Sequence, residues 1–82
     1  MDRDNVFEII QNLFRDVFDD DEIILTDETT ANDIDEWDSL QNITILAAIE
    51  EDFGIKFQIS EARHLVNIGA LVDLVVNKVN KN

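Results

Sequence analysis

The sequence has no cysteine, only six lysine and arginine residues, and no long uninterrupted run of apolar residues. The absence of cysteine excludes disulfide bonds, thiolate metal ligands and a nucleophilic thiol of the chain's own. Any thiol chemistry must come from a group attached to the chain. No apolar run approaches the roughly 20 residues of a membrane span, and the first residues, MDRDNVF, are acidic. We therefore expect a soluble cytoplasmic protein that does not associate with a membrane.

Acidic residues outnumber basic ones by nineteen to six, which gives a net charge of −13. Nucleic acid is an improbable ligand, because its phosphates require the lysine and arginine that are scarce here. Between Arg15 and Lys56 there are fourteen acidic residues and no basic one. One face of the molecule should therefore be electronegative, which speeds transient, salt-dependent encounters with basic surfaces. We expect protein partners with basic docking patches.

A chain of 82 residues is long enough for one small domain and too short for two. The hydrophobic fraction of 45% argues against disorder, although the net charge must repel itself in the compact state. We predict that residues 1–82 form a single domain with one core, and that this domain is a monomer.

The middle of the chain carries a well-delimited helix, in the stretch EWDSLQNITILAAIEEDF. Asp38 is a good N-cap, and Gln41 three residues later completes the pattern of a capping box. Gly54 stands where the helix should end, because a residue without Cβ adopts the left-handed conformation easily. Ser39 is then the first helical residue, with its hydroxyl at the positive end of the helix.

Helical spacing of apolar residues predicts two further long helices. The first should be capped by Asp4 and end near Phe18, with its apolar stripe formed by Phe7, Ile9, Ile10, Leu13, Phe14, Val17 and Phe18. The last should be capped by Asn67, with Ile68, Leu71, Val72, Val75 and Val79 on one face and Lys78 and Lys81 near its negative end.

Two shorter turns are also expected. Thr29 or Thr30 can start a single turn through Ile34, and Ser60 can cap a brief turn through His64, with Leu65 and Val66 packing inward. Ile55, Lys56, Phe57 and Ile59 are expected to form a short apolar link, with an edge strand that has no obvious partner as the alternative. Trp37 is interpreted as a lid on the core rather than a cargo contact. The predicted fold class is all-α, a small four-helix bundle of three main helices and one short helix.

The middle helix has apolar residues on more than one face. Ile45, Leu46, Ile49 and Phe53 should face the core, while Leu40, Ile43 and Ala47 form a neighbouring strip. Either all of them are core, or the strip is open as a docking surface. We favour the docking surface, because Glu50 and Glu51 continue that side with charge, as in an interaction patch with a polar rim.

Few residues suit catalysis or metal binding. A hydrolytic triad would need Ser39 or Ser60 with His64, and no Gly-x-Ser-x-Gly elbow is present, so we expect a protein without catalytic residues. The acidic run Asp19 to Glu22 is interpreted as a solvated loop. Neither Asp27 nor Asp33 begins an EF-hand pattern, which leaves weak Mg²⁺ or Ca²⁺ association as the alternative to no metal.

Asp38-Ser39-Leu40, followed by an aliphatic helix that runs into AIEEDFG, resembles the attachment motif of acyl carrier proteins. The preceding stretch TTANDIDEWDSL resembles the approach to the serine in stand-alone members of that family. The resemblance implies that Ser39 is esterified by 4′-phosphopantetheine, delivered from coenzyme A by a phosphopantetheinyl transferase, with Asp38 and Leu40 beside it. The thiol of that group holds acyl cargo as a thioester between the enzymes of fatty-acid, polyketide or related biosynthesis.

The same resemblance implies that partner enzymes recognise the middle helix. The surface that we predict for them there consists of Leu40, Ile43, Ala47, Glu50 and Glu51. Two positions depart from the pattern of fatty-acid carriers, since Thr44 replaces a frequent glutamate and Ala47 a larger apolar residue. These departures leave the partner enzymes open. The alternatives are a peptidyl or aminoacyl carrier with the same prosthetic group, and a helical interaction module without one.

Overall fold

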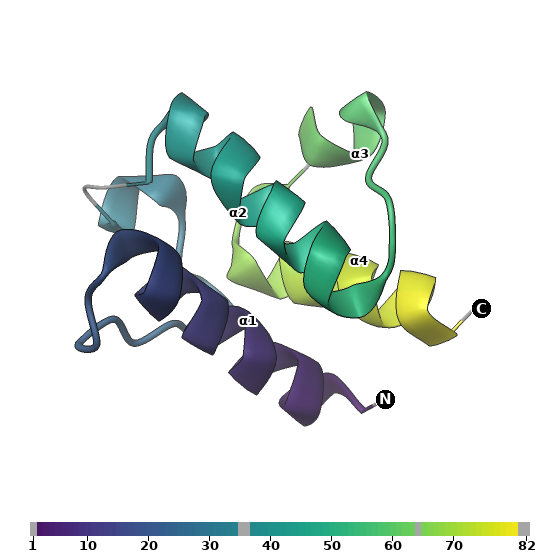
Figure 1. Cartoon of the computed structure of the whole chain (residues 1–82), viewed down its shortest axis with the longest axis horizontal. Helices are drawn as coiled ribbons and strands as arrows, with labels where there is room; N and C mark the ends of the chain where they lie inside the picture. Colours follow the sequence, from purple (N-terminus) through teal and green to yellow (C-terminus); the bar gives the residue numbers. More distant parts are fainter. Residues whose placement is uncertain (1, 35–36, 64, 81–82) are drawn as a thin grey trace.

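A computed structural model describes residues 2–34, 37–63 and 65–80, with every side chain in these ranges except those of Ser39 and Arg63. The elements are α1 (Arg3–Phe18), the 3₁₀ turn η1 (Ala31–Asp33), α2 (Ser39–Phe53), α3 (Ile59–Arg63) and α4 (Ile68–Asn80). The described ranges contain no strand, so the predicted all-α bundle of three main helices and one short helix is confirmed. Helix α1 runs antiparallel to both α2 and α4 (Figure 1).

Helix α1 begins earlier than its sequence pattern indicates. Asp2, in extended backbone, is the N-cap and its carboxylate accepts from Asn5 N at 2.9 Å, so the predicted Asp4 cap is wrong. Asp4 lies instead in the first turn, where its charge favours the helix dipole. Val6, which the predicted stripe did not include, is buried on the same face as Ile10 and Phe14, and the predicted end at Phe18 is confirmed.

Helix α2 begins and ends as its sequence predicts. Asp38 Oδ1 accepts from Gln41 N at 2.8 Å, and Gly54 adopts a left-handed φ of 67° at the other end. Ile45 and Ile49 are fully buried, while Leu46 and Phe53 are partly buried against the same core. The predicted core face of this helix is therefore confirmed.

The core fills the space between α1, α2 and α4. Its buried members are Val6, Ile10, Phe14, Ile23, Leu25, Ile45, Ile49, Ile55, Ile68, Leu71, Val72 and Val75. Trp37 covers one end of it: the ring lies edge-on to Phe14 at 5.0 Å between centroids, and Nε1 donates to Asn42 Oδ1 at 3.0 Å. The interpretation of Trp37 as a lid on the core is confirmed.

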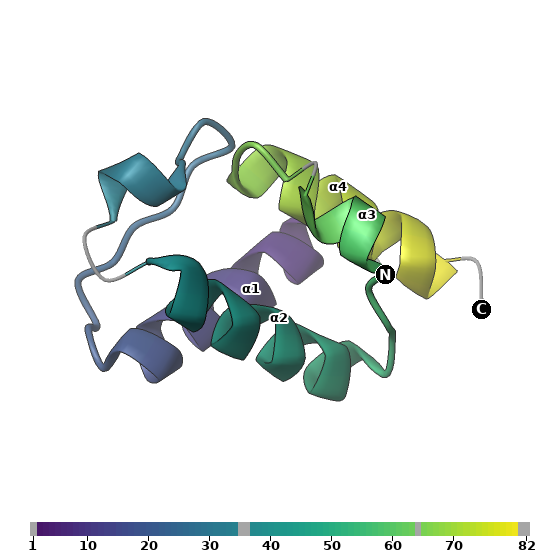
Figure 2. The same cartoon turned by 90° about the horizontal axis from the view of Figure 1, so that it is seen from above.

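The connection between α1 and α2 is tied to the helices by hydrogen bonds. Arg15 Nε donates to Ile23 O at 2.8 Å, and Leu25 N donates to Gln11 Oε1 at 2.8 Å. Thr30 caps η1, which confirms the predicted turn in this segment. Figure 2 shows this connection lying beside the start of α4.

Three groups join that connection to α4. Ile68 N donates to Thr29 O at 2.8 Å, and Gly69 N donates to Asp27 O at 2.9 Å. Arg3 also bridges Asp27 and Asp73, at 3.0 and 2.7 Å. Hydrogen bonds to Asp73 and Asp27 raise the pKa of the Arg3 guanidinium above its ordinary value. The loop therefore provides acceptors for N–H groups in the first turn of α4.

The segment from α3 to α4 departs from two predictions. Helix α3 starts at Ile59, so Ser60 lies inside it and is not its cap. Leu65 is half-buried as expected, but Val66 is 71% exposed and does not pack inward. The predicted Asn67 cap is confirmed, since its Oδ1 accepts from Ala70 N at 2.9 Å.

Lys78 and Lys81 were predicted to lie near the negative end of the last helix, and the structure describes one of them. Lys78 lies in the last turn and pairs with Glu61 on α3 at 2.8 Å. His64 and Lys81, which also figured in the predictions, lie outside the described residues. Among the described helices, none has both the length and the apolar character needed to cross a bilayer.

Candidate functional site

The start of α2 combines a strong cap with an exposed position. Asp38 is exposed and extended, its carboxylate accepts from Gln41 N, and its carbonyl accepts from Asn42 N at 2.8 Å. Ser39 is the first residue of α2, as the sequence predicts. The first N–H groups of an α-helix have no acceptor within the helix, and the dipole makes this end positive. An anionic group linked to this residue would be stabilised here.

A hollow of about 230 Å³ lies beside this N-cap, and we term it the cap hollow. It is lined by Ala31, Trp37, Asp38, Asn42, Leu65 and Val66. Three segments therefore meet next to the start of α2: η1, the first turn of α2 and the link before α4. Val66 contributes an apolar side chain to the hollow, while the Asp38 cap contributes a carboxylate and Asn42 of α2 an amide. This mixture suits a pendant group that has both polar and apolar parts.

The exposed apolar residues of α2 form a strip, Leu40, Ile43 and Ala47, which we term the α2 strip. Leu40 is 70% and Ile43 66% exposed, and Ala47 is also exposed. The predicted exposure of these residues is confirmed, whereas their role in docking remains a prediction. Their exposure contrasts with the burial of Ile45 and Ile49 on the opposite side of the same helix.

The structure separates the two acidic residues that the sequence groups together. Glu51 is exposed, but Glu50 is half-buried and its Oε2 accepts from Phe57 N at 2.8 Å. A groove of about 210 Å³ runs between α2 and α3, lined by Ile43, Leu46, Ala47, Glu50, Phe57, Gln58, Ile59 and Ala62. We term it the α2–α3 groove. Ile59, 75% exposed, belongs to this surface and was missed because its neighbours predict an apolar link.

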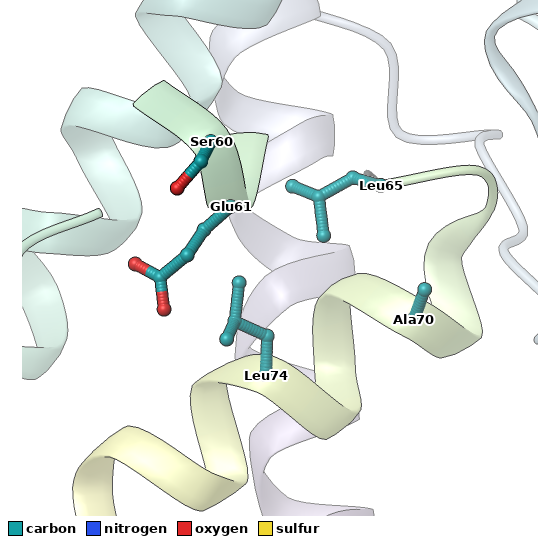
Figure 3. Close-up of a pocket in the computed structure, with 5 residues that line it drawn as sticks. All are labelled: Ser60, Glu61, Leu65, Ala70 and Leu74. Carbon is teal, nitrogen blue, oxygen red and sulfur yellow. The ribbon is translucent and has the colours of Figure 1, made fainter. Parts of the chain in front are cut away.

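A second hollow lies between α3 and α4 (Figure 3) and has a volume of about 380 Å³. Ser60 and Glu61 line it from α3, Ala70 and Leu74 from α4, and Leu65 from the link between them. Glu61 Oε1 also accepts from Gln58 N at 2.8 Å and pairs with Lys78. One carboxylate therefore ties the start of α3 to the last turn of α4.

The other candidate chemistries receive no support from the described part of the chain. Within it, three or more histidine, cysteine, aspartate or glutamate residues nowhere gather as a metal site would require. Ser39 and Ser60 lie on different helices, α2 and α3, and His64 lies outside the described residues.

Comparisons with known proteins agree with this geometry. Residues 8–75 match the protein family described as "Phosphopantetheine attachment site". A curated relative, an acyl carrier protein of Cyanidium caldarium, is 34% identical over 59 residues, which cover 72% of this chain and 67% of the relative. The solution NMR structure of holo acyl carrier protein from Geobacter metallireducens is 45% identical with a TM-score of 0.88, covering 93% of this chain and 87% of that one.

The chain therefore belongs to the phosphopantetheine attachment family, the class of small helical domains whose cofactor is a covalently attached 4′-phosphopantetheine. Within that class it is a member of the acyl carrier proteins. Proteins of this family carry acyl groups and do not catalyse their conversion.

Proposed function

We propose that Ser39 is the attachment residue for phosphopantetheine, and that the chain presents acyl groups to the enzymes of fatty-acid, polyketide or related biosynthesis. The observation that carries the proposal is the position of Ser39 as the first residue of α2, directly after the Asp38 cap. A phosphodiester at this position meets the positive end of the helix dipole. When bound, the group supplies a terminal thiol that holds the acyl cargo.

The residues around Ser39 have distinct roles in this proposal. Asp38 fixes the first turn of α2 through Gln41 N, so that the attachment residue is held in one place. Leu40 is exposed beside it and offers an apolar contact to an approaching enzyme. The cap hollow provides room for the part of the group nearest the protein. The transferase provides the catalysis, and this chain provides the serine hydroxyl at a fixed position.

The α2 strip and the acidic residues beside it support docking to basic enzymes. The strip is apolar and exposed, Glu51 is exposed at its end, and the whole chain carries a net charge of −13. Charge of this sign raises the rate of encounter with a basic patch and makes the contact salt-dependent. We assign to this surface the phosphopantetheinyl transferase and the acyl-transferring synthases, with the chain acting as a single monomeric domain in the cytoplasm.

The test is intact mass after incubation with coenzyme A and a transferase of broad specificity. The wild-type chain should gain one phosphopantetheinyl increment, and Ser39→Ala should gain none. Ser60 is the only other serine, so Ser60→Ala is the matched control and should gain the same increment as the wild type. No increment in the wild type, or an increment in Ser39→Ala, would show that the assignment is wrong.

A further inference from the structure

Glu50 makes three backbone contacts at the end of α2. Its carbonyl accepts from Gly54 N and from Ile55 N, the latter at 3.1 Å, and its Oε2 accepts from Phe57 N at 2.8 Å. Glu51, the next residue, is exposed to solvent. Two adjacent acids with the same charge therefore differ in what their side chains contact.

These contacts hold residues 54–58, which we term the α2–α3 link. Ile55 is buried and Phe57 packs partly on the core, so the link has an apolar anchor as well as a polar one. The next N–H along the chain, that of Gln58, donates to Glu61 Oε1 at 2.8 Å. Consecutive N–H groups of the link are thus bound by carboxylates from α2 and from α3. A half-buried hydrogen bond to a charged acceptor is stronger than one between neutral groups.

The fixed link determines where α3 begins and where Ile59 lies. Ile59 is exposed and lines the α2–α3 groove together with Ile43 and Ala47 of the α2 strip. The apolar docking surface therefore has two sides, one from α2 and one from the start of α3. The second side depends on the path of the link and not on α2 alone.

We infer that Glu50 is a positioning residue, whose acceptor oxygen holds the α2–α3 link so that Ile59 completes the docking surface. Its part in partner engagement is then structural, and the charge of Glu51 is the one presented to the partner. The inference rests on the proposed function for the docking role of this surface. The contacts that fix the link are independent of that function.

Three variants separate the acceptor from the charge. Glu50→Met removes the acceptor at similar length, Glu50→Gln keeps an acceptor oxygen without charge, and Glu51→Gln is the matched control. The measurements are amide hydrogen exchange at Phe57, and kcat and KM for phosphopantetheine transfer from coenzyme A by a broad transferase at low and moderate salt.

Glu50→Met should speed exchange of the Phe57 amide about tenfold and raise KM several-fold with little change in kcat. Glu50→Gln should bring both values closer to wild type than Glu50→Met does, because its amide oxygen still accepts from Phe57 N, although the bond is weaker without the charge. Glu51→Gln should leave the exchange rate unaltered and flatten the salt dependence of KM.

Equal KM increases in Glu50→Gln and Glu50→Met would overturn the inference, because the position would then act through its charge. Unchanged Phe57 exchange in Glu50→Met would also overturn it. If Glu50→Met does not fold, the two glutamine variants still test the inference. A change in the salt dependence of KM in Glu50→Gln as large as that in Glu51→Gln would contradict a positioning role for Glu50. A wild-type chain that accepts no phosphopantetheine would refute the proposed function, while the exchange rates would still test whether Glu50 holds the link.

Discussion

Replacing Gly69 with alanine should destabilise the protein, although alanine is the better helix former. Gly69 lies in the first turn of α4 and is buried against the α1–α2 connection. A Cβ built at this position would lie 3.0 Å from Asp27 O and 3.1 Å from Asp27 Cβ. That carbonyl is the acceptor of Gly69 N at 2.9 Å, so it has little freedom to withdraw. The loop must shift, and the hydrogen bond to Asp27 must lengthen.

The size of the effect follows from three opposing terms. Alanine in place of glycine favours a helix by about 1 kcal/mol. Overpacking against fixed atoms costs about 1–3 kcal/mol, and a weakened hydrogen bond costs about 1 kcal/mol. The net loss is about 1–3 kcal/mol, and each kcal/mol lowers the Tm of a domain of this size by about 4–8 °C.

Thermal and urea unfolding followed by circular dichroism will measure this loss. Asn77→Ala is the matched control, since Asn77 is exposed within α4 and the change should raise stability by about 0.5 kcal/mol. Gly54→Ala provides a second comparison: no atom lies within 4 Å of its Cβ, and only the φ of 67° opposes the change. A Gly69→Ala protein as stable as Asn77→Ala would show that the loop relaxes freely, and the reasoning would be refuted.

Four further results are expected. Asp38→Ala should lower the free energy of unfolding by about 1 kcal/mol while Asp38→Asn stays near wild type, and equal losses in urea titrations would contradict a capping role. Trp37→Phe should lower the free energy of unfolding by about 1 kcal/mol, because it removes the hydrogen bond to Asn42. An unchanged urea midpoint would contradict this prediction. Moderate salt or Mg²⁺ should raise the Tm of the wild type by screening a net charge of −13, and a flat or falling Tm would exclude this effect. Arg3→Met should lower the Tm at low salt more than at high salt, because Arg3 pairs with Asp27 and Asp73 at the surface. An equal decrease in Tm at the two salt concentrations would indicate that Arg3 acts through packing instead.

Local signals predicted the limits of α2 and the start of α4 correctly. Asp38, Gly54 and Asn67 act on backbone groups within three or four residues, so their effect is contained in the nearby sequence. The start of α1 was predicted wrongly at Asp4, because aspartate is a good cap and both Asp2 and Asp4 precede the apolar stripe.

The wrong predictions concern features that depend on the three-dimensional path of the chain and not on the local sequence. Val66 was expected to pack inward and Ile59 to belong to a short apolar link, yet both side chains are exposed, and Ile59 is the first residue of α3. The hydrogen bond of Glu50 to Phe57 joins residues seven positions apart across a helix end, and helical spacing carries no signal for it. The cap hollow brings Leu65 and Val66 beside residues 31–42, which lie more than twenty positions earlier in the sequence.

Of the candidate site, the sequence predicted the position of the attachment residue but not the residues that surround it. The position of Ser39 at the start of a helix follows from the cap and the apolar pattern around it. The surroundings of that position depend on η1 and on the link before α4, whose places are set by hydrogen bonds such as Ile68 N to Thr29 O.

Helix α2 is held at both ends, by Asp38 at one and by the contacts of Glu50 at the other, and its far side is buried. A partner that meets its exposed strip therefore encounters a surface already in its final conformation. Association then requires little loss of backbone freedom, and its heat-capacity change should reflect only the apolar area covered rather than coupled folding. The same rigid face can be released quickly, because dissociation requires no segment to unfold.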